Sequence, residues 1–243
     1  MSLTISVFVP GQTERDVCDL LDRSLGIALT RSDGGRPFAW VFGIHISINT
    51  DFVPRWRAPG AADLTIDLTW YEGSVVDSAA AEAFMKAAAS VIAQLIRHSK
   101  NSDCVLLCED EPVELGEVAD APGVAVQDQV ELLADGAAVV DVVGVLARLQ
   151  IGLRPDAAQA ATWRASVLRL DVVVAPGSPL TRQKHDVSTA VRVGTDNFPD
   201  RRVVLWELVR TVLELLGSAL EDELLVQCYL SDRNRPSPLP GSA

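Results

Sequence analysis

The chain alternates between two hydrophobic patterns, one typical of half-buried strands and one typical of amphipathic helices. Apolar and polar residues alternate one by one in 44–49 and again in 63–70. A period of two places one face of a strand on a core and the other toward solvent. In 13–26 and 78–98 the apolar residues instead recur at helical spacing, which predicts helices with one buried face. We therefore expect strands and helices in the first half of the chain.

The order of these segments predicts the architecture of that half. Thr13 opens a capping box for the first helix, and Gly26 is placed to end it. The expected elements are a strand at 5–9, a helix at 13–26, strands at 38–49 and 63–70, a helix at 78–98 and a strand at 104–108, with a short edge strand at 113–115. This β-α-β-β-α-β order is that of the ferredoxin-like fold, in which the helices cover one face of an antiparallel sheet.

The second half repeats the pattern of the first. Segment 5–30 aligns with 130–154, so that Gly11 matches Gly136, Asp16 matches Asp141, Arg23 matches Arg148, and later Cys108 matches Cys228. Matches of glycine and charged residues are not forced by hydrophobic periodicity alone. The expected elements are a strand at 130–133, a helix at 137–149, strands at 167–174 and 186–193, a helix at 197–220 and a strand at 224–229, with an alanine-rich insertion at 155–162.

We therefore predict an α+β protein made of two tandem ferredoxin-like repeats. The first repeat is expected at 4–116, a linker at 117–126, the second repeat at 127–232 and a disordered tail at 233–243. The relative arrangement of the repeats and the oligomeric state stay open.

Composition narrows the classes of partner and compartment. The net charge of −12 opposes binding to phosphate backbones, so we expect no nucleic-acid partner. No apolar run is long enough to span a membrane, and the N-terminus lacks the pattern of a signal peptide. The four scattered cysteines, Cys18, Cys104, Cys108 and Cys228, suit free thiols in a reducing compartment. The cytoplasm is the expected location.

The sequence contains no familiar catalytic constellation. His45, His98 and His185 are far apart in sequence and lack the spacing of metal ligands, so we expect no metal and no cofactor. There is no nucleophile elbow, Walker A loop or dinucleotide-binding glycine motif. Asp63 and Asp67 lie on the polar side of one strand and could form an acid–base pair, although strand acids are more commonly solvated. The sequence favours a non-enzymatic protein.

Two stretches are candidates for binding a protein. The loop at 52–57 presents Phe52, Arg55, Trp56 and Arg57, side-chain types that are enriched at binding hot spots, although its aromatic residues could equally cover the core. An acidic run could attract a basic partner, and its members are Glu109, Asp110, Glu111, Glu114 and Glu117.

The first repeat resembles the immunity proteins of bacterial swarming-inhibition (Sit) toxin systems. The resemblance covers roughly 4–116 and rests on three stretches, Leu20–Ile27, Ile44–Ile48 and Asp103–Glu111. The chain departs from the family by being doubled, and by having Cys-Glu-Asp-Glu where the family tends to have Phe-Asn-Gly-Glu. The resemblance implies a small cytoplasmic protein that neutralises a toxin by binding it, and it supplies no catalytic residues.

The function expected from the sequence is thus protein binding, with a basic toxin domain as the partner. An alternative is a small-molecule or enzymatic site between the repeats, for which Asp63, Asp67, Asp171 and Arg192 are the candidate lining residues. A third possibility is a structural protein that oligomerises through the Trp56 loop.

Overall fold

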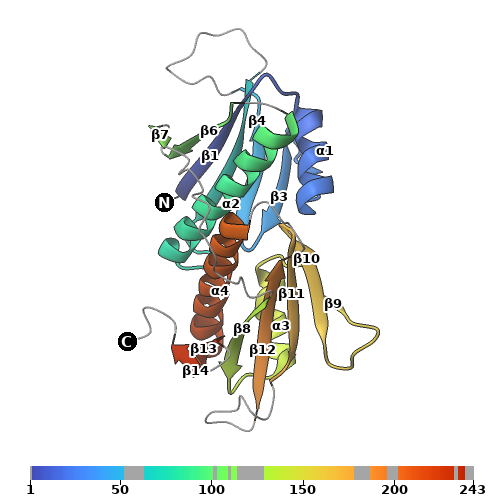
Figure 1. Ribbon diagram of the computed structural model, residues 1–243, viewed down its shortest axis with the longest axis vertical. Helices are drawn as coiled ribbons and strands as arrows, with labels where there is room; N and C mark the ends of the chain where they lie inside the picture. The colour runs from blue at the N-terminus through green and yellow to red at the C-terminus, as the bar shows by residue number, and fades with distance from the viewer. Residues whose placement is uncertain are drawn as a thin grey trace.

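The fold is known from a computed structural model of the whole chain. The structure describes residues 2–51, 63–100, 103–108, 111–113, 129–177, 187–195, 202–232 and 235–238. Within these ranges the chain forms two antiparallel sheets and four helices, and Figure 1 shows the two sheets one above the other along the long axis. The expectation of an α+β protein with antiparallel sheets is confirmed.

The first sheet has the strand order β2-β3-β4-β5-β1-β6-β7. Its strands are β1 (Ser2–Pro10), β2 (Thr30–Arg31), β3 (Pro37–Val41), β4 (Ile44–Asn49), β5 (Asp63–Tyr71), β6 (Val105–Cys108) and β7 (Glu111–Val113). Helix α1 (Glu14–Leu25) follows β1, and α2 (Ser78–Lys100) follows β5. Both helices therefore connect strands of this one sheet.

The second sheet has the strand order β14-β13-β8-β12-β11-β10-β9. Read from the other end, this is the order of the first sheet, with β8 in the place of β1, β9 in the place of β2 and so on to β14 in the place of β7. Its strands are β8 (Gln129–Asp135), β9 (Arg154–Pro155), β10 (Trp163–Val167), β11 (Leu170–Pro176), β12 (Ser188–Thr195), β13 (Gln227–Asp232) and β14 (Arg235–Pro238). Helices α3 (Val139–Arg148) and α4 (Arg202–Leu224) occupy the places of α1 and α2.

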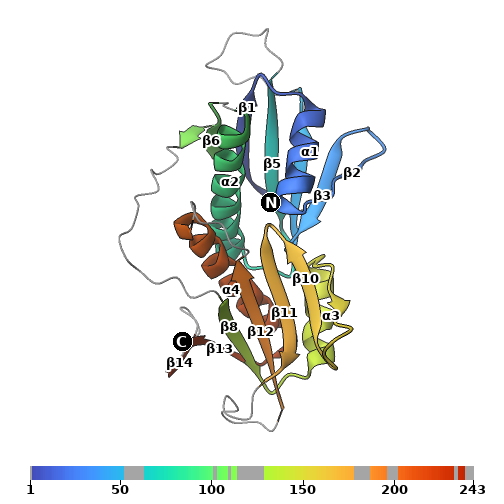
Figure 2. The ribbon, with the colours of Figure 1, turned by 45° about the vertical axis from the view of Figure 1, so that its right-hand side comes forward.

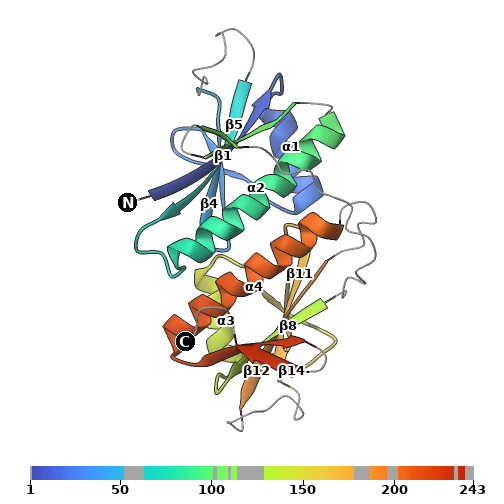
Figure 3. The same ribbon diagram turned by 60° about the vertical axis from the view of Figure 1, so that its left-hand side comes forward.

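The two long helices pack against each other and join the two halves. Figure 3 shows α2 and α4 side by side, and their residues make many mutual contacts. Figure 2 shows α1 and α2 over the same face of the first sheet. The buried apolar residues of both halves form one contiguous core. Helix α2 is long and apolar enough to cross a membrane, but most of its apolar stretch is buried here, as in a core helix.

The end of the first helix has a counterpart in the second half. Thr13 caps α1 by accepting the Asp16 amide proton, and Gly26 ends the helix with φ 65°. At the end of α3 the corresponding residue is Gln150, with φ 59°. In both places the next residue donates its amide proton to a carbonyl near the helix end, Ile27 to Leu21 and Ile151 to Leu146.

Two hairpins were not expected from the sequence. The segment 38–49 was predicted to be one extended stretch, but it turns at Phe42 and Gly43, whose φ values are 53° and 75°. The segment 167–174 turns in the same way at Leu168 and Arg169, with φ 54° and 58°. Two positive φ values in succession make the tight turn that matches strand twist. Phe42, Leu168 and Arg169 are not typical residues for such a turn, so the local sequence gave no signal.

Smaller expectations about the second half are also corrected. The alanine-rich segment 155–162 is not a separate insertion: Pro155 ends β9, and 156–162 form the hairpin loop to β10, which corresponds to the loop between β2 and β3. Strand β13 begins at Gln227 because α4 continues to Leu224. Part of the expected tail, Arg235–Pro238, pairs with β13 as an edge strand. The expected linker 117–126 lies outside the described residues.

The strand register also corrects one match between the halves. Val7 pairs with Leu106 in the first sheet, and Leu132 pairs with Leu230 at the corresponding place in the second. Two residues before these partners stand Cys104 and Cys228, both fully or almost fully buried. Cys228 is therefore the counterpart of Cys104 and not of Cys108.

Reciprocal hydrogen bonds fix the seam between the halves. The Gly43 amide, in the β3–β4 turn, donates to the Leu149 carbonyl at 2.9 Å. In the other direction the Leu168 amide, in the β10–β11 turn, donates to the Leu25 carbonyl at 2.7 Å. Arg169 Nε adds a bond to the Ser24 carbonyl. Each half thus places a strand turn on the end of the other half's short helix.

Candidate functional site

The helix-free face of the first sheet carries an aromatic cluster, which we call the platform and define as Phe38, Trp40, His45 and Tyr71. Strand alternation places it there, because the neighbours of these residues along the chain face the helices and are mostly buried. Trp40 and His45 are cross-strand partners next to the Phe42–Gly43 turn. The unexpected hairpin is therefore what brings the platform together.

The rings of the platform are in mutual contact. His45 lies between the others, with its centroid 5.1 Å from Trp40, 5.6 Å from Phe38 and 6.1 Å from Tyr71. The Trp40 and Tyr71 centroids are 6.1 Å apart. Trp40 is nevertheless 41% exposed and Tyr71 45% exposed. Large aromatic side chains that are ordered by one another and still open to solvent are typical of interaction surfaces.

The polar residues beside the platform give it acidic character. Partial burial lowers the pKa of His45, and the Asp67 carboxylate opposes this shift only in part, so the imidazole is neutral at pH 7. Asp67 lies one row further along the sheet, where its carboxylate accepts a 2.7 Å hydrogen bond from the Ser6 hydroxyl. Among the described residues it has no ion-pair partner.

Alternation predicts that the whole helix-free face is exposed to solvent, but part of it is buried. Thr65 and Thr69 are buried although they alternate with core residues. Thr69 lies between His45 and Thr4, and its hydroxyl is 3.2 Å from the Thr4 hydroxyl. Thr65 pairs with Phe8, which is itself buried. The solvent-exposed part of the face is thus concentrated at the platform end.

The corresponding face of the second sheet is charged rather than aromatic. Ser166 and Asp171 stand next to the Leu168–Arg169 turn, in the positions of Trp40 and His45. The positions of Ser6 and Asp67 are taken by Glu131 and Arg192, which form a 2.7 Å ion pair.

A polar groove of about 540 Å³ lies along this second face, and its charged lining residues are Arg154, Asp156, Arg164 and Asp171. Arg164 and Asp156 are 2.6 Å apart. The Ala158 amide and then Arg164 lower the pKa of Asp156. Two of the four charges in the groove are therefore already satisfied by each other.

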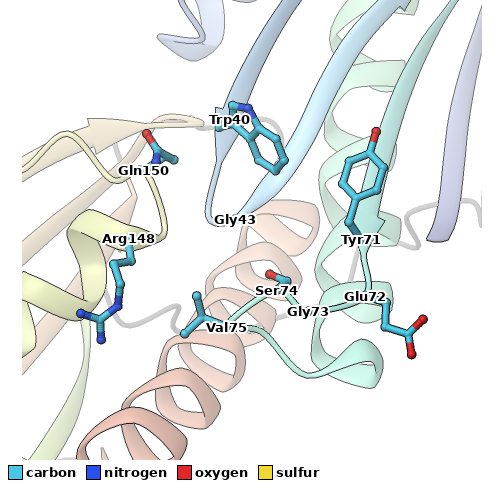
Figure 4. A pocket seen from close by; sticks show the side chains of 9 residues that line it. All are labelled: Trp40, Gly43, Tyr71, Glu72, Gly73, Ser74, Val75, Arg148 and Gln150. Atoms are coloured by element: carbon cyan, nitrogen blue, oxygen red, sulfur yellow. The ribbon is translucent and has the colours of Figure 1, made fainter. Parts of the chain in front are cut away.

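A cavity of about 340 Å³ lies at the seam beside the platform. Figure 4 shows Trp40 and Tyr71 on strands of the first sheet, with Gln150 on the opposite side and Ser74 and Val75 below. The remaining lining residues are Gly43, Glu72, Gly73 and Arg148. The charged ends of Glu72 and Arg148 point away from the centre of the site (Figure 4). Arg148 is instead bound to Glu223 at 2.7 Å.

The residues expected to bind a partner are not those of the platform. Phe52, Arg55, Trp56, Arg57, Glu109, Asp110 and Glu114 lie outside the described residues, and Glu111 is described only as the first residue of β7. The four residues expected in a site between the halves, Asp63, Asp67, Asp171 and Arg192, do not line the seam cavity. The sequence did carry one signal for the platform: Phe38, Trp40 and His45 fall on the polar side of an alternating pattern.

The described residues contain no group of three or more His, Cys, Asp or Glu side chains that could hold a metal ion. His45 belongs to the platform, and His98 is exposed near the end of α2. The cysteines are free thiols, and burial raises the pKa of Cys228 to about 12, which keeps it in the unreactive thiol form.

The chain was compared with protein-family models and with curated proteins. No family model matches it, and no curated protein is similar enough to match.

Proposed function

We propose that the protein is a non-enzymatic binding module that holds a protein partner on the platform, in the manner of a toxin-neutralising immunity protein. The observation that carries the proposal is the exposure of Trp40 and Tyr71 within one ordered aromatic cluster. Aromatic side chains bury a large area with little loss of conformational entropy, which is why they dominate binding hot spots. A protein partner would cover them.

We further propose that each half is a ferredoxin-like unit with an added hairpin. The order β1-α1-β4-β5-α2-β6 within the first half supports this assignment, and the second half has the same order. In such a unit one sheet face is occupied by helices, so the opposite face is the larger surface left for a partner. The platform occupies that face in the first half.

The toxin-neutralising role rests on charge and on the sequence resemblance. With a net charge of −12, the protein would attract a basic toxin domain over a distance and accelerate their association. The resemblance of 4–116 to swarming-inhibition immunity proteins gives such a domain as the partner. The acidic Glu109–Glu114 stretch remains a candidate second contact.

The test is neutralisation in living cells. The gene neighbourhood would be searched for toxin-like domains, each would be co-expressed with the protein, and cell growth would be followed. We expect the native protein to restore growth, and the double variant Trp40→Ala/Tyr71→Ala to fail at equal abundance. Val140→Ala is the matched control, because Val140 is a large apolar side chain on α3 that is 73% exposed. Failure of the native protein to protect would refute the immunity role, and protection by the double variant would refute the platform.

A second candidate function is the binding of a small molecule at the seam. The observation that favours it is the cavity of about 340 Å³, a volume at the lower end of the range for ligand sites. A fragment library of aromatic acids and amines can be screened through the indole NMR signal of Trp40. Binding that disappears when Val75→Trp fills the cavity would support this candidate, and a library without binders would remove it.

A further inference from the structure

Among the described residues that border the platform, the arginines are already paired with carboxylates. Three arginines lie on the bordering segments, and each has a carboxylate partner: Arg31 with Glu14 at 2.6 Å, Arg36 with Asp51 at 2.8 Å and Arg148 with Glu223 at 2.7 Å. Asp67, in contrast, accepts a hydrogen bond from the Ser6 hydroxyl and forms no ion pair with any residue that the structure describes. The local field therefore favours a positively charged guest over a negative one.

The rings themselves favour the same guest. The face of an indole or phenol ring carries negative potential, so that it attracts a cation placed over it. Trp40 provides the stronger of these faces and Tyr71 the second, and both are open to solvent. His45 adds no opposing charge at neutral pH, because its burial lowers the pKa of the imidazole.

From this arrangement we infer that the partner places an arginine side chain on Trp40 and Tyr71, with its guanidinium directed toward Asp67. This inference rests on the proposed function and specifies the chemistry of its partner. Arginine fits better than lysine because its planar guanidinium stacks on aromatic faces and is more weakly hydrated. The contact joins stacking on the rings to the charge of a carboxylate on the same sheet face, one row beyond His45.

A nucleic acid is the competing occupant of an aromatic sheet face. Exposed aromatic residues on a four-stranded sheet stack bases in some RNA-binding modules. Those modules also surround the rings with basic residues that hold the phosphates. Here the bordering arginines are paired with carboxylates and the whole chain carries a charge of −12, so the observations favour the arginine.

The experiment is an NMR titration of the full-length, nitrogen-15-labelled protein. The probe is the peptide acetyl-Gly-Gly-Arg-Gly-Gly-amide, added at constant ionic strength, and the readout is the indole signal of Trp40, which Trp40→Phe assigns. We expect the signal to move with half-saturation at about 10 to 100 mM, the range for a single side chain on two rings. The Trp163 indole, on the second sheet, should not move.

Two controls separate a cation effect from general crowding or charge. The same peptide with citrulline in place of arginine keeps the shape and removes the charge, and it should produce no shift. Asp67→Asn should weaken arginine binding about threefold. Asp63→Asn removes the same charge from the other end of β5, about 13 Å away along the strand, and should leave the affinity unchanged.

The outcomes distinguish this inference from the proposed function. Equal shifts with citrulline, no shift with arginine, or a response to single-stranded oligouridine alone would overturn the inference. If the platform variant loses protection against the toxin while the arginine peptide does not shift the Trp40 indole signal, the binding role is supported and the arginine contact is refuted. If the peptide binds but the toxin is not neutralised, the immunity role falls instead.

Discussion

The two sheets of this protein have the same strand order but opposite characters on their helix-free faces. In the first sheet the row next to the tight turn presents Trp40 and His45, and in the second it presents Ser166 and Asp171. One row further along, the Ser6–Asp67 hydrogen bond corresponds to the Glu131–Arg192 ion pair. The second sheet pairs several of its charges with one another, whereas the first leaves aromatic surface open.

The helix-facing layers do not show this contrast. Val7 and Leu132 stand at corresponding places and are both fully buried, as are the apolar residues around them. Packing against helices restricts these positions to apolar side chains of suitable volume in both halves. The difference between the halves therefore teaches that the fold constrains one face of each sheet and leaves the other available for a specific function.

The largest effect is expected from Gly43, where the two halves meet. A Cβ atom there would lie 3.2 Å from a Leu149 methyl and 3.3 Å from a Val76 methyl, and φ is 75°. We predict that Gly43→Val lowers the free energy of unfolding by about 3 to 4 kcal/mol, through backbone strain and overpacking. Urea unfolding followed by circular dichroism measures it.

Gly35 is the matched control for this variant, because its φ is 78° but a Cβ atom would meet nothing within 4 Å. Gly35→Val should cost only the backbone strain, about 1 to 2 kcal/mol. Equal destabilisation by the two variants would show that the seam is not tightly packed at Gly43.

The next effect concerns the contrast between the two open faces. The double variant Ser6→Glu/Asp67→Arg gives the first sheet the ion pair of the second, and should change stability by less than about 1 kcal/mol. Because it places a positive charge beside the platform, we predict at least about 30-fold weaker binding of the toxin domain, or about 2 kcal/mol. Calorimetric titration measures both the affinity and its salt dependence.

The reverse exchange, Glu131→Ser/Arg192→Asp, alters the second sheet by the same chemistry and should leave toxin affinity unchanged. If both exchanges weakened binding to the same degree, the first sheet would not be the preferred binding surface for the toxin domain. If neither did, the partner would bind elsewhere.

A smaller effect is expected at Cys104 and Cys228, whose backbones are bound by helix side chains of opposite charge. Glu221 in α4 accepts the Cys228 amide proton at 2.9 Å, while at the corresponding place Arg97 in α2 donates to the Cys104 carbonyl at 2.6 Å. We predict that Glu221→Ala lowers the free energy of unfolding by about 1.5 kcal/mol, because a partly buried amide loses its acceptor. Glu221→Gln retains an acceptor and should cost much less, as thermal unfolding can show. A glutamine variant as unstable as the alanine one would mean that charge, and not the hydrogen bond, matters there.

The smallest effect is the pH dependence contributed by His45. Burial lowers its pKa in the folded state, while the nearby Asp67 works in the opposite direction and Tyr71 is the other titratable group that faces it. The unfolded chain then binds a proton more readily, so stability should fall as the pH decreases below about 6.5. His45 is only partly buried, so the change in Tm should be no more than about 2 °C. His45→Phe should remove this fall in Tm between pH 7.5 and 5.5. If the variant shows the same fall in Tm as the native protein, His45 is not its cause.

Much of the fold could be predicted from the sequence because its signals are local and periodic. The Thr13 cap, the Gly26 stop and the stripe of α2 are set by neighbouring residues, and all three have the expected structure. The hairpin at Phe42–Gly43 could not be predicted in this way, because a bulky residue at positive φ is unfavourable locally and is stabilised here by burial of Phe42 against Phe84.

The platform was missed for the same reason. Trp40 and His45 become cross-strand neighbours only through that turn, and Tyr71 joins them from a strand more than twenty residues further along the chain. Local composition pointed instead to the Phe52–Arg57 loop, which lies outside the described residues. The seam cavity is equally remote from local signals, since it combines Trp40 and Tyr71 with Arg148 and Gln150.

The central claim is that the aromatic face of the first sheet, and not the equivalent face of the second, holds the partner. The most direct measurement is the affinity of the toxin domain identified by the neutralisation test for two variants at the same topological position, Trp40→Ser and Ser166→Ala, by calorimetric titration. We predict at least about tenfold weaker binding for Trp40→Ser, with Ser166→Ala within about twofold of the native protein. Native affinity in Trp40→Ser, or an equal loss in both variants, would contradict the claim.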